Sequence, residues 1–142
     1  MVFGELNGGA TDTASGPQTT SGLVVNSSAG TAMFASNQID VFAAHGCGRR
    51  TFQVGTENQR DFVKGNFWRL QSTTVPGQTG LSSFETGGLY DIYFENSGLA
   101  GTVGVRMEAV AGGNHIRGYN NCQVPIEEVG SAAGAKSTNT FT

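Results

Sequence analysis

Glycine and proline interrupt this chain so often that they limit the folds it can adopt. The sequence has 142 residues, of which 22 are Gly and 3 are Pro, and only one window free of both, 31–45, is longer than ten residues. In a helix interior Gly costs about 1 kcal/mol and Pro about 3 kcal/mol relative to Ala, so long helices are disfavoured. We therefore expect short strands joined by turns.

Two segments show strand patterns most clearly. Over Thr102–Val110 apolar and polar residues alternate, which is typical of a strand with one buried face. Over Leu89–Glu95 both faces carry apolar side chains, as in a central strand covered on both sides. Residues 96–101 between them are of hairpin length, so we expect these two strands to pair.

Further strands are expected where short apolar runs lie between glycine-rich turns. About eight strands result, which is typical of an antiparallel β-sandwich, a jelly roll or a small barrel, and this is the fold class that we predict. Besides the two strands above and the window 31–45, the predicted strands are Leu23–Asn26, Thr51–Gly55, Asn66–Thr73, Ile116–Tyr119 and Gln123–Ile126.

One short connecting helix is expected after residue 55. The run 56–59, Thr-Glu-Asn-Gln, has the form of a capping box, and Lys64 followed by Gly65 has the form of a helix end. The helix would have two turns at most. It would connect two strands of the β body.

Small and polar residues fill both ends of the chain. We predict an extended N-terminal arm over 1–22, a β-sandwich or barrel domain over 23–129 and a flexible C-terminal arm over 130–142. Isolated apolar groups on these arms would dock on a neighbouring molecule, and plain terminal disorder is the alternative. These groups are Val2, Phe3, Leu6 and Phe141.

The charge balance argues against two classes of partner. The net charge is −3, and only 13% of the residues are charged, so the chain offers no basic field for a nucleic acid. No stretch approaches the roughly 20 apolar residues of a membrane helix, and the first residues lack the basic and apolar regions of a secretory signal. We expect neither a nucleic-acid nor a membrane partner.

The segment 44–50 is the most unusual in composition. His45 and Cys47, with His115 and Cys122, are residue types that zinc accepts, but the tight Cys-x2-Cys or His-x3-His spacing of structural zinc sites is missing. We therefore predict no metal site and no cofactor. Whether the two cysteines form a disulfide stays open.

Two arginines end the same segment. Arg49 and Arg50 follow a Gly-Cys-Gly turn, but the glycine pattern of a dinucleotide or Walker A loop is incomplete. Guanidinium groups bind carboxylates in bidentate pairs. We expect Arg49 and Arg50 to bind carboxylates of an adjacent subunit.

The sequence shows no catalytic constellation. The Gly-x-Ser-x-Gly turn of hydrolases is missing. Asp91 and Glu95 would lie about 13 Å apart along one strand, beyond the roughly 6.5–9.5 Å of an inverting glycosidase. We predict that the chain is not an enzyme.

Aromatic residues suggest a sugar-binding face. Aromatic rings beside a carboxylate could stack on sugar rings and bond their hydroxyls if they are exposed, whereas buried rings would only fill the core. The candidates for this glycan site are Trp68, Tyr90, Asp91 and Tyr93, with Phe67 and Tyr119 as further rings.

Two hypotheses of function follow. The first is a structural assembly protein, with a virion surface component such as a phage head-decoration or cement protein as the leading example. It would bind a capsid through its β body and arms, form a homo-oligomer such as a trimer, and assemble in the host cytoplasm. The second is an extracellular lectin-like or adhesin β-sandwich that binds glycans through an exposed aromatic face.

Overall fold

The computed structural model consists of short strands. It describes residues 2–7, 21–25, 33–45, 50–55, 63–74, 79–96, 102–108, 111–129 and 139–142. Within these ranges there are 13 strands and no helix. The all-β class is therefore confirmed.

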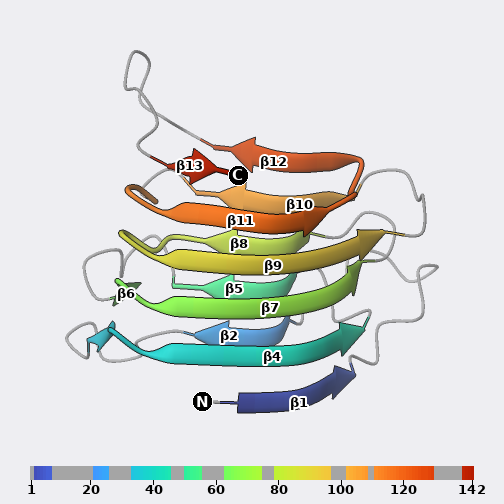
Figure 1. Ribbon diagram of the computed structural model, residues 1–142, viewed down its shortest axis with the longest axis horizontal. Coiled ribbons are helices and arrows are strands. Elements are labelled where there is room, and N and C mark those ends of the chain that lie inside the picture. The colour runs from blue at the N-terminus through green and yellow to red at the C-terminus, as the bar shows by residue number, and fades with distance from the viewer. Residues whose placement is uncertain are drawn as a thin grey trace.

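The strands form three sheets, two of them large and facing each other (Figure 1). The six-stranded sheet has the order β1-β4-β7-β9-β11-β13, and its strands are β1 (Val2–Asn7), β4 (Gln38–His45), β7 (Phe67–Thr74), β9 (Leu89–Asn96), β11 (His115–Asn120) and β13 (Thr140–Phe141). The five-stranded sheet has the order β12-β10-β8-β5-β2, and its strands are β2 (Ser21–Val25), β5 (Arg50–Val54), β8 (Thr79–Ser83), β10 (Val103–Met107) and β12 (Val124–Glu128). The third sheet pairs β3 (Phe34–Ala35) with β6 (Val63–Lys64).

The chain winds through these sheets as a coil, because successive long strands alternate between the two large sheets. Each turn, or rung, supplies one strand to each: β4 and β5, then β7 and β8, β9 and β10, β11 and β12. Residue Gln38 pairs with Phe67, which pairs with Leu89, then His115, then Thr140, so these rungs span 22 to 29 residues. The first rung, which supplies β1 and β2, spans 38 residues, because Val2 pairs with Asp40. This architecture is a parallel β-solenoid.

The predicted antiparallel sandwich, jelly roll or barrel is wrong, because the paired strands in all three sheets run parallel. The predicted hairpin fails with it. Its two strands are β9 and β10, which lie in different sheets: β9 pairs with β7 and β11, and β10 pairs with β8 and β12. Residue alternation reports which face of a strand is buried but not the direction of its neighbour.

The predicted connecting helix is not seen where the structure describes the chain. Residues 56–62 lie outside the described ranges, while Val63 and Lys64 form β6. Gly65 has φ = 62°, the left-handed conformation that a glycine at a helix end also adopts. A turn between two strands therefore carries the same glycine signal as the end of a helix.

The apolar residues at both ends belong to strands. Val2, Phe3 and Leu6 lie on β1, which pairs with β4 at one edge of the six-stranded sheet. Phe141 lies on β13 at the opposite edge, pairs with Ile116 and packs against the core. Residues 8–20 and 130–138, which make up most of the predicted arms, lie outside the described ranges.

The core fills the space between the two large sheets. In-register parallel pairing places equivalent side chains of successive rungs above one another, so buried rings stack along the coil. Trp68 and Tyr90 stack with ring centroids 6.0 Å apart, as do Phe34 and Trp68. The largest fully buried apolar side chains are Trp68, Tyr90, Phe52, Phe94, Ile39, Leu70, Leu81, Met107 and Ile116.

A ladder of asparagines runs along the coil beside this core. Each of its residues directly precedes a strand of the six-stranded sheet. The Asn37 backbone N–H and its Nδ2 both donate to Asn66 Oδ1, at 2.9 and 3.1 Å. The Asn114 backbone N–H and Nδ2 donate to Asn139 Oδ1 in the same way, at 3.1 and 2.9 Å. The ladder satisfies backbone N–H groups where the chain turns from one sheet to the next, including that of the buried Asn114.

Glu85 completes this ladder in the rung that lacks an asparagine. Gly88 stands at that position, and a Cβ on it would lie 2.6 Å from Glu85 Oε2. The carboxylate fills the space: Oε1 accepts from the Asn66 N–H at 2.8 Å and from Asn66 Nδ2 at 2.7 Å. Oε2 accepts from Trp68 Nε1 at 2.6 Å and from the Tyr90 hydroxyl. Gly88 is thus required because Glu85 occupies the place of an asparagine side chain.

Burial has the largest effect on the pKa of the Glu85 carboxyl group. It raises the pKa of the Glu85 carboxyl above its ordinary value, although hydrogen bonds from Tyr90, Asn66 and Trp68 act in the opposite direction. Burial and the nearby carboxylate also raise the pKa of the Tyr90 hydroxyl.

The Glu85 side chain fills the space that an asparagine side chain at position 88 would fill. Substitutions at positions 85 and 88 should therefore have non-additive effects on stability. Glu85→Ala leaves the Asn66 and Trp68 donors without an acceptor and should cost about 3 kcal/mol of unfolding free energy. Gly88→Asn alone should cost about 1–3 kcal/mol through overpacking. The double variant restores an asparagine to the empty place, so urea unfolding should show a loss at least about 1 kcal/mol smaller than the sum. Additive losses would show that Glu85 does not stand in for the asparagine.

The raised pKa of Glu85 predicts a pH dependence of stability. The folded protein holds the Glu85 proton to a higher pH than the unfolded chain, whose ordinary value is 4.5. The unfolding free energy of the wild type, relative to Glu85→Gln, should therefore be constant below pH 4.5 and fall as the pH rises above it. Urea titrations from pH 3.5 to 8 would measure the difference. A difference that grows with pH would contradict this assignment.

Candidate functional site

The outer face of the six-stranded sheet gathers polar and aromatic side chains of four adjacent strands, most of them exposed, whereas Asp40 is largely covered. Alternation along each strand turns these side chains away from the core. The parallel register sets Asp40 opposite Arg69, Arg69 opposite Asp91, and Asp91 opposite Arg117. The outer face is defined here by Gln38, Asp40, Arg69, Gln71, Asp91, Tyr93, Arg117 and Tyr119.

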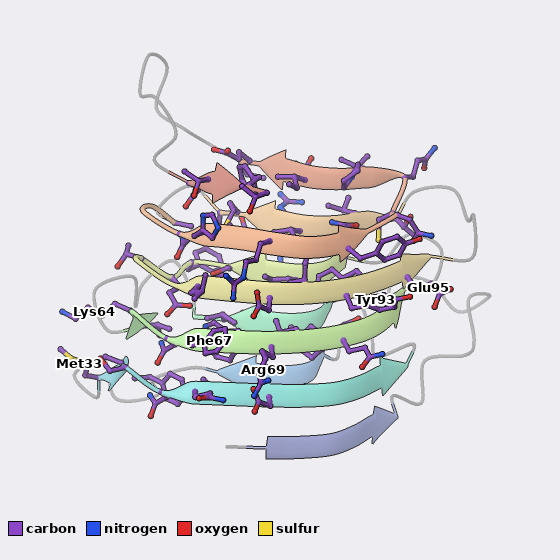
Figure 2. All side chains as sticks on the ribbon, in the orientation of Figure 1. Met33, Lys64, Phe67, Arg69, Tyr93 and Glu95 are labelled. Carbon is purple, nitrogen blue, oxygen red and sulfur yellow. The ribbon has the colours of Figure 1, made fainter. Side chains whose placement is uncertain are left out.

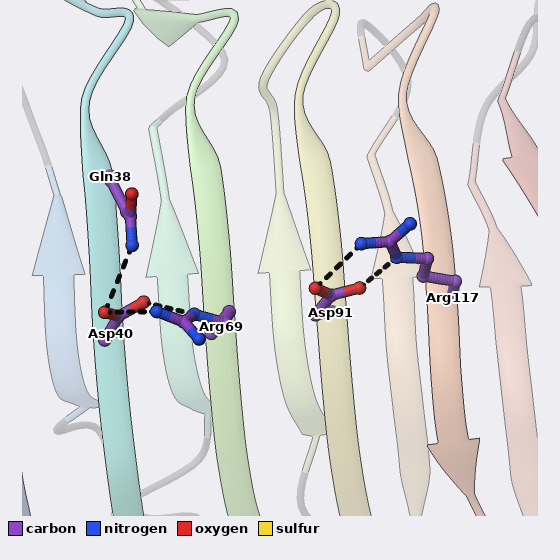
Figure 3. A network of polar contacts seen from close by, with 5 residues as sticks. All are labelled: Gln38, Asp40, Arg69, Asp91 and Arg117. Carbon is purple, nitrogen blue, oxygen red and sulfur yellow. Dashed lines mark hydrogen bonds and ion pairs between the residues drawn. The ribbon is translucent and has the colours of Figure 1, made fainter.

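The four charged residues form two bidentate ion pairs (Figure 3). Arg69 Nε donates to Asp40 Oδ1 at 2.8 Å and its Nη2 to Asp40 Oδ2 at 3.0 Å. Arg117 contacts Asp91 in the same manner, through Nε to Oδ1 and through Nη2 to Oδ2 at 3.0 Å. Gln38 Nε2 adds a third donor to Asp40, at 3.3 Å. The formal charges of the four residues cancel.

These pairs fix the ionisation of both carboxyl groups. The hydrogen bonds from Arg69 lower the pKa of Asp40, and those from Arg117 lower the pKa of Asp91. Both carboxylates are therefore ionised near neutral pH. A general acid needs a pKa near the working pH, so these carboxylates are suited to accepting hydrogen bonds and not to delivering a proton.

An exposed aromatic pair lies next to the charged residues. Tyr93 and Tyr119 are opposite each other in register and stack with ring centroids 4.9 Å apart and planes 25° apart. Their exposed fractions are 46% and 47%, which is high for large apolar rings. Figure 2 shows Tyr93 and Arg69 on neighbouring strands of the front sheet.

A shallow groove of about 230 Å³ runs between β7 and β9 on this face. Its polar and aromatic lining comes from Arg69, Gln71, Asp91 and Tyr93. The almost fully buried Val41, Leu70 and Ile92 also line it. The side chains of Val41, Leu70 and Ile92 belong to the core, so the backbone of the sheet forms the floor of the groove. The groove therefore offers hydrogen-bond donors, acceptors and an aromatic ring above that floor.

The predicted glycan-binding residues divide between the two faces of the sheet. Asp91 and Tyr93 lie on the outer face beside the groove. Trp68 and Tyr90 are fully buried and bond Glu85, so they offer no ring face to a ligand. Five residues of the outer face were not predicted from the sequence: Gln38, Asp40, Arg69, Gln71 and Arg117. Strand alternation could have identified these residues, because each lies an even number of residues from another outer-face residue on its own strand.

The predicted partner-binding residues are not brought together. Arg50 lies on β5, where its Nη1 donates to Gln53 Oε1 at 3.1 Å, and Arg49 lies outside the described ranges. Phe141 is partly buried at one edge of the six-stranded sheet, and the strand that holds Val2, Phe3 and Leu6 is at the other.

The described part of the chain holds no cluster of three or more His, Cys, Asp or Glu residues that could bind a metal ion. His115 bonds Thr140 and Thr142, and Cys122 lies in the core. Cys47 falls outside the described ranges. None of the described elements is a helix long and apolar enough to cross a membrane.

Comparisons with known family models, curated proteins and solved structures found no match for this chain.

The two ion pairs predict separable effects on the carboxyl groups. Arg69→Gln should raise the pKa of Asp40 toward its ordinary value of 3.8 and raise that of Asp91 much less, because Arg117 is the main cause of the lowered pKa of Asp91. Arg117→Gln should raise the pKa of Asp91 and leave that of Asp40 close to its wild-type value, so it serves as the matched control. Carboxyl ¹³C NMR titration measures both groups at once. If neither variant moves its partner's pKa, the pairs are not formed in solution.

Proposed function

We propose that the chain is a non-catalytic structural attachment protein, in which the β-solenoid is a scaffold and the outer face makes the contact with a partner surface. The observation that carries this proposal is the pairing of Asp40 with Arg69 and of Asp91 with Arg117. Paired charges on a flat sheet form a fixed pattern of donors and acceptors that a partner can match.

The ionisation of the acidic groups supports contact over catalysis. The two carboxyl groups of the outer face have lowered pKa values. Among the carboxyl groups that the structure describes, the one with a raised pKa, Glu85, is buried on the other side of the sheet and is engaged by three residues. The groove thus has no acid and base with pKa values pushed apart, the arrangement that acid–base catalysis uses.

The edges of the sheets support a role in a larger assembly. On β12, the outermost strand of the five-stranded sheet, Val124 and Ile126 are exposed although they pair in register with Val103 and the buried Val105. Edge strands with apolar side chains are surfaces that another chain can cover. We propose that such contacts, with the segments around Val2–Leu6 and Phe141, join the chain to an assembly such as a virion surface.

A binding measurement with the full chain tests the proposal. Labelled chain is titrated onto intact particles or cells of its source, and we expect saturable binding without consumption of any surface component. The combined variant Gln71→Ala, Arg117→Gln should bind at least about tenfold more weakly. Lys64→Ala, an exposed change on β6 away from the outer face, is the matched control and should bind as the wild type does. Full binding by the outer-face variant would place the contact elsewhere and overturn the proposal.

A further inference from the structure

We propose that the groove between β7 and β9 binds a neutral oligosaccharide, with a sugar ring against Tyr93 and its hydroxyls on Arg69, Gln71 and Asp91. This inference rests on the proposed contact role of the outer face and names the ligand class of that contact. It is carried by the chemistry of the groove lining together with the exposed aromatic pair.

The aromatic ring provides a stacking surface. Tyr93 lies between Gln71 on β7 and Tyr119 on β11 in the register of the sheet. Tyr119 covers one side of the ring, and the groove reaches Tyr93 from the side of Gln71. The negative face of an aromatic ring attracts the weakly positive C–H groups of a sugar. The stacking contact with Tyr119 also holds the Tyr93 ring in place before a ligand arrives.

The polar lining suits hydroxyl groups. Ionised Asp91 only accepts hydrogen bonds, Arg69 only donates them, and the Gln71 amide does both. A sugar hydroxyl both donates and accepts, so it can bridge neighbouring residues of this set. The three residues lie in register on two adjacent strands, which gives the groove a regular pattern of partners.

The charge pattern favours a neutral over an acidic saccharide. Each arginine of the outer face is already engaged by an aspartate through two hydrogen bonds. A carboxylate or sulfate on the ligand would have to displace Asp40 or Asp91 from the Nε–Nη2 side of an arginine or be limited to its remaining Nη1 and Nη2 hydrogens. The ionised Asp91 at the groove would also repel it.

The position of the groove argues against an extended peptide. Peptides commonly add to a sheet at an exposed edge, where backbone groups are free to pair. The groove lies over β7 and β9, which are internal strands with neighbours on both sides. Its polar groups are therefore side chains, as recognition of hydroxyls requires.

The groove should bind weakly. Its volume of about 230 Å³ is below the roughly 300 Å³ at which ligand pockets begin, and it is open. We expect a Kd on the order of 1 mM for one groove. Tight attachment would then need several grooves acting together in an oligomer.

An NMR titration of the ¹⁵N-labelled full chain tests the inference. The probes are hexamers of glucose, galactose, mannose and N-acetylglucosamine, with hexagalacturonate as the acidic comparison. We expect saturable shifts of Gln71, Asp91 and Tyr93 with at least one neutral probe and at least tenfold weaker binding of the acidic one. Tyr93→Ser and Gln71→Ala should each weaken the binding at least fivefold. Met33→Ser, exposed and off the groove, is the matched control.

The outcomes separate this inference from the proposed function. Binding of none of the neutral probes, preference for hexagalacturonate, or shifts away from the groove would each overturn the inference. If Tyr93→Ser and Gln71→Ala lose attachment to particles or cells while no neutral probe binds, the outer face is the contact and the ligand class is wrong. If both variants attach normally and no probe binds, both proposals fall.

Discussion

The interaction on which this structure depends is the ladder of side-chain oxygens that accepts backbone N–H groups where each rung enters the six-stranded sheet. These N–H groups lie at a corner, where no neighbouring strand can accept them. Leaving the buried ones, those of Asn66, Gly88 and Asn114, unsatisfied would cost about 1–3 kcal/mol each. The ladder holds the rungs in register, and the same register aligns the charged residues outside. Its acceptors are Asn66 Oδ1, Glu85 Oε1, Asn114 Oδ1 and Asn139 Oδ1.

The positions of most of the longer strands were predictable from the sequence, but their direction was not. The prediction missed β8 and assigned β1 and β13 to arms. Alternation over Thr102–Val110 reports a buried face and correctly marks β10, yet it holds equally for parallel and antiparallel neighbours. A repeated dipeptide marks the coil in the sequence, because a glycine or serine is followed by asparagine at Ser36, Gly65 and Gly113. In the structure these three residues have positive φ. Rungs of 22 to 38 residues, and a glycine in place of one asparagine, hide this repeat from a search for a fixed period.

The candidate site was predictable only in part. Asp91 and Tyr93 were named because an aromatic residue stood beside an acidic one, but Tyr90 was named by the same reasoning and faces the core. Tyr90 and Tyr93 are three residues apart, and residues an odd number apart on a strand point to opposite faces of the sheet. The partners Arg69 and Arg117 come from other rungs. Only the register of the parallel sheet brings them to Asp40 and Asp91.

Interstrand proton contacts in solution test the central claim, the parallel in-register coil, most directly. The structure predicts NOEs between the amide and Hα protons of β9 and those of both β7 and β11, in the register of Arg69 with Asp91 and of Asp91 with Arg117. It also predicts no strand-to-strand contacts between β9 and β10. Strong Hα–Hα contacts between Leu89–Asn96 and Val103–Met107, the signature of an antiparallel pair, would contradict it.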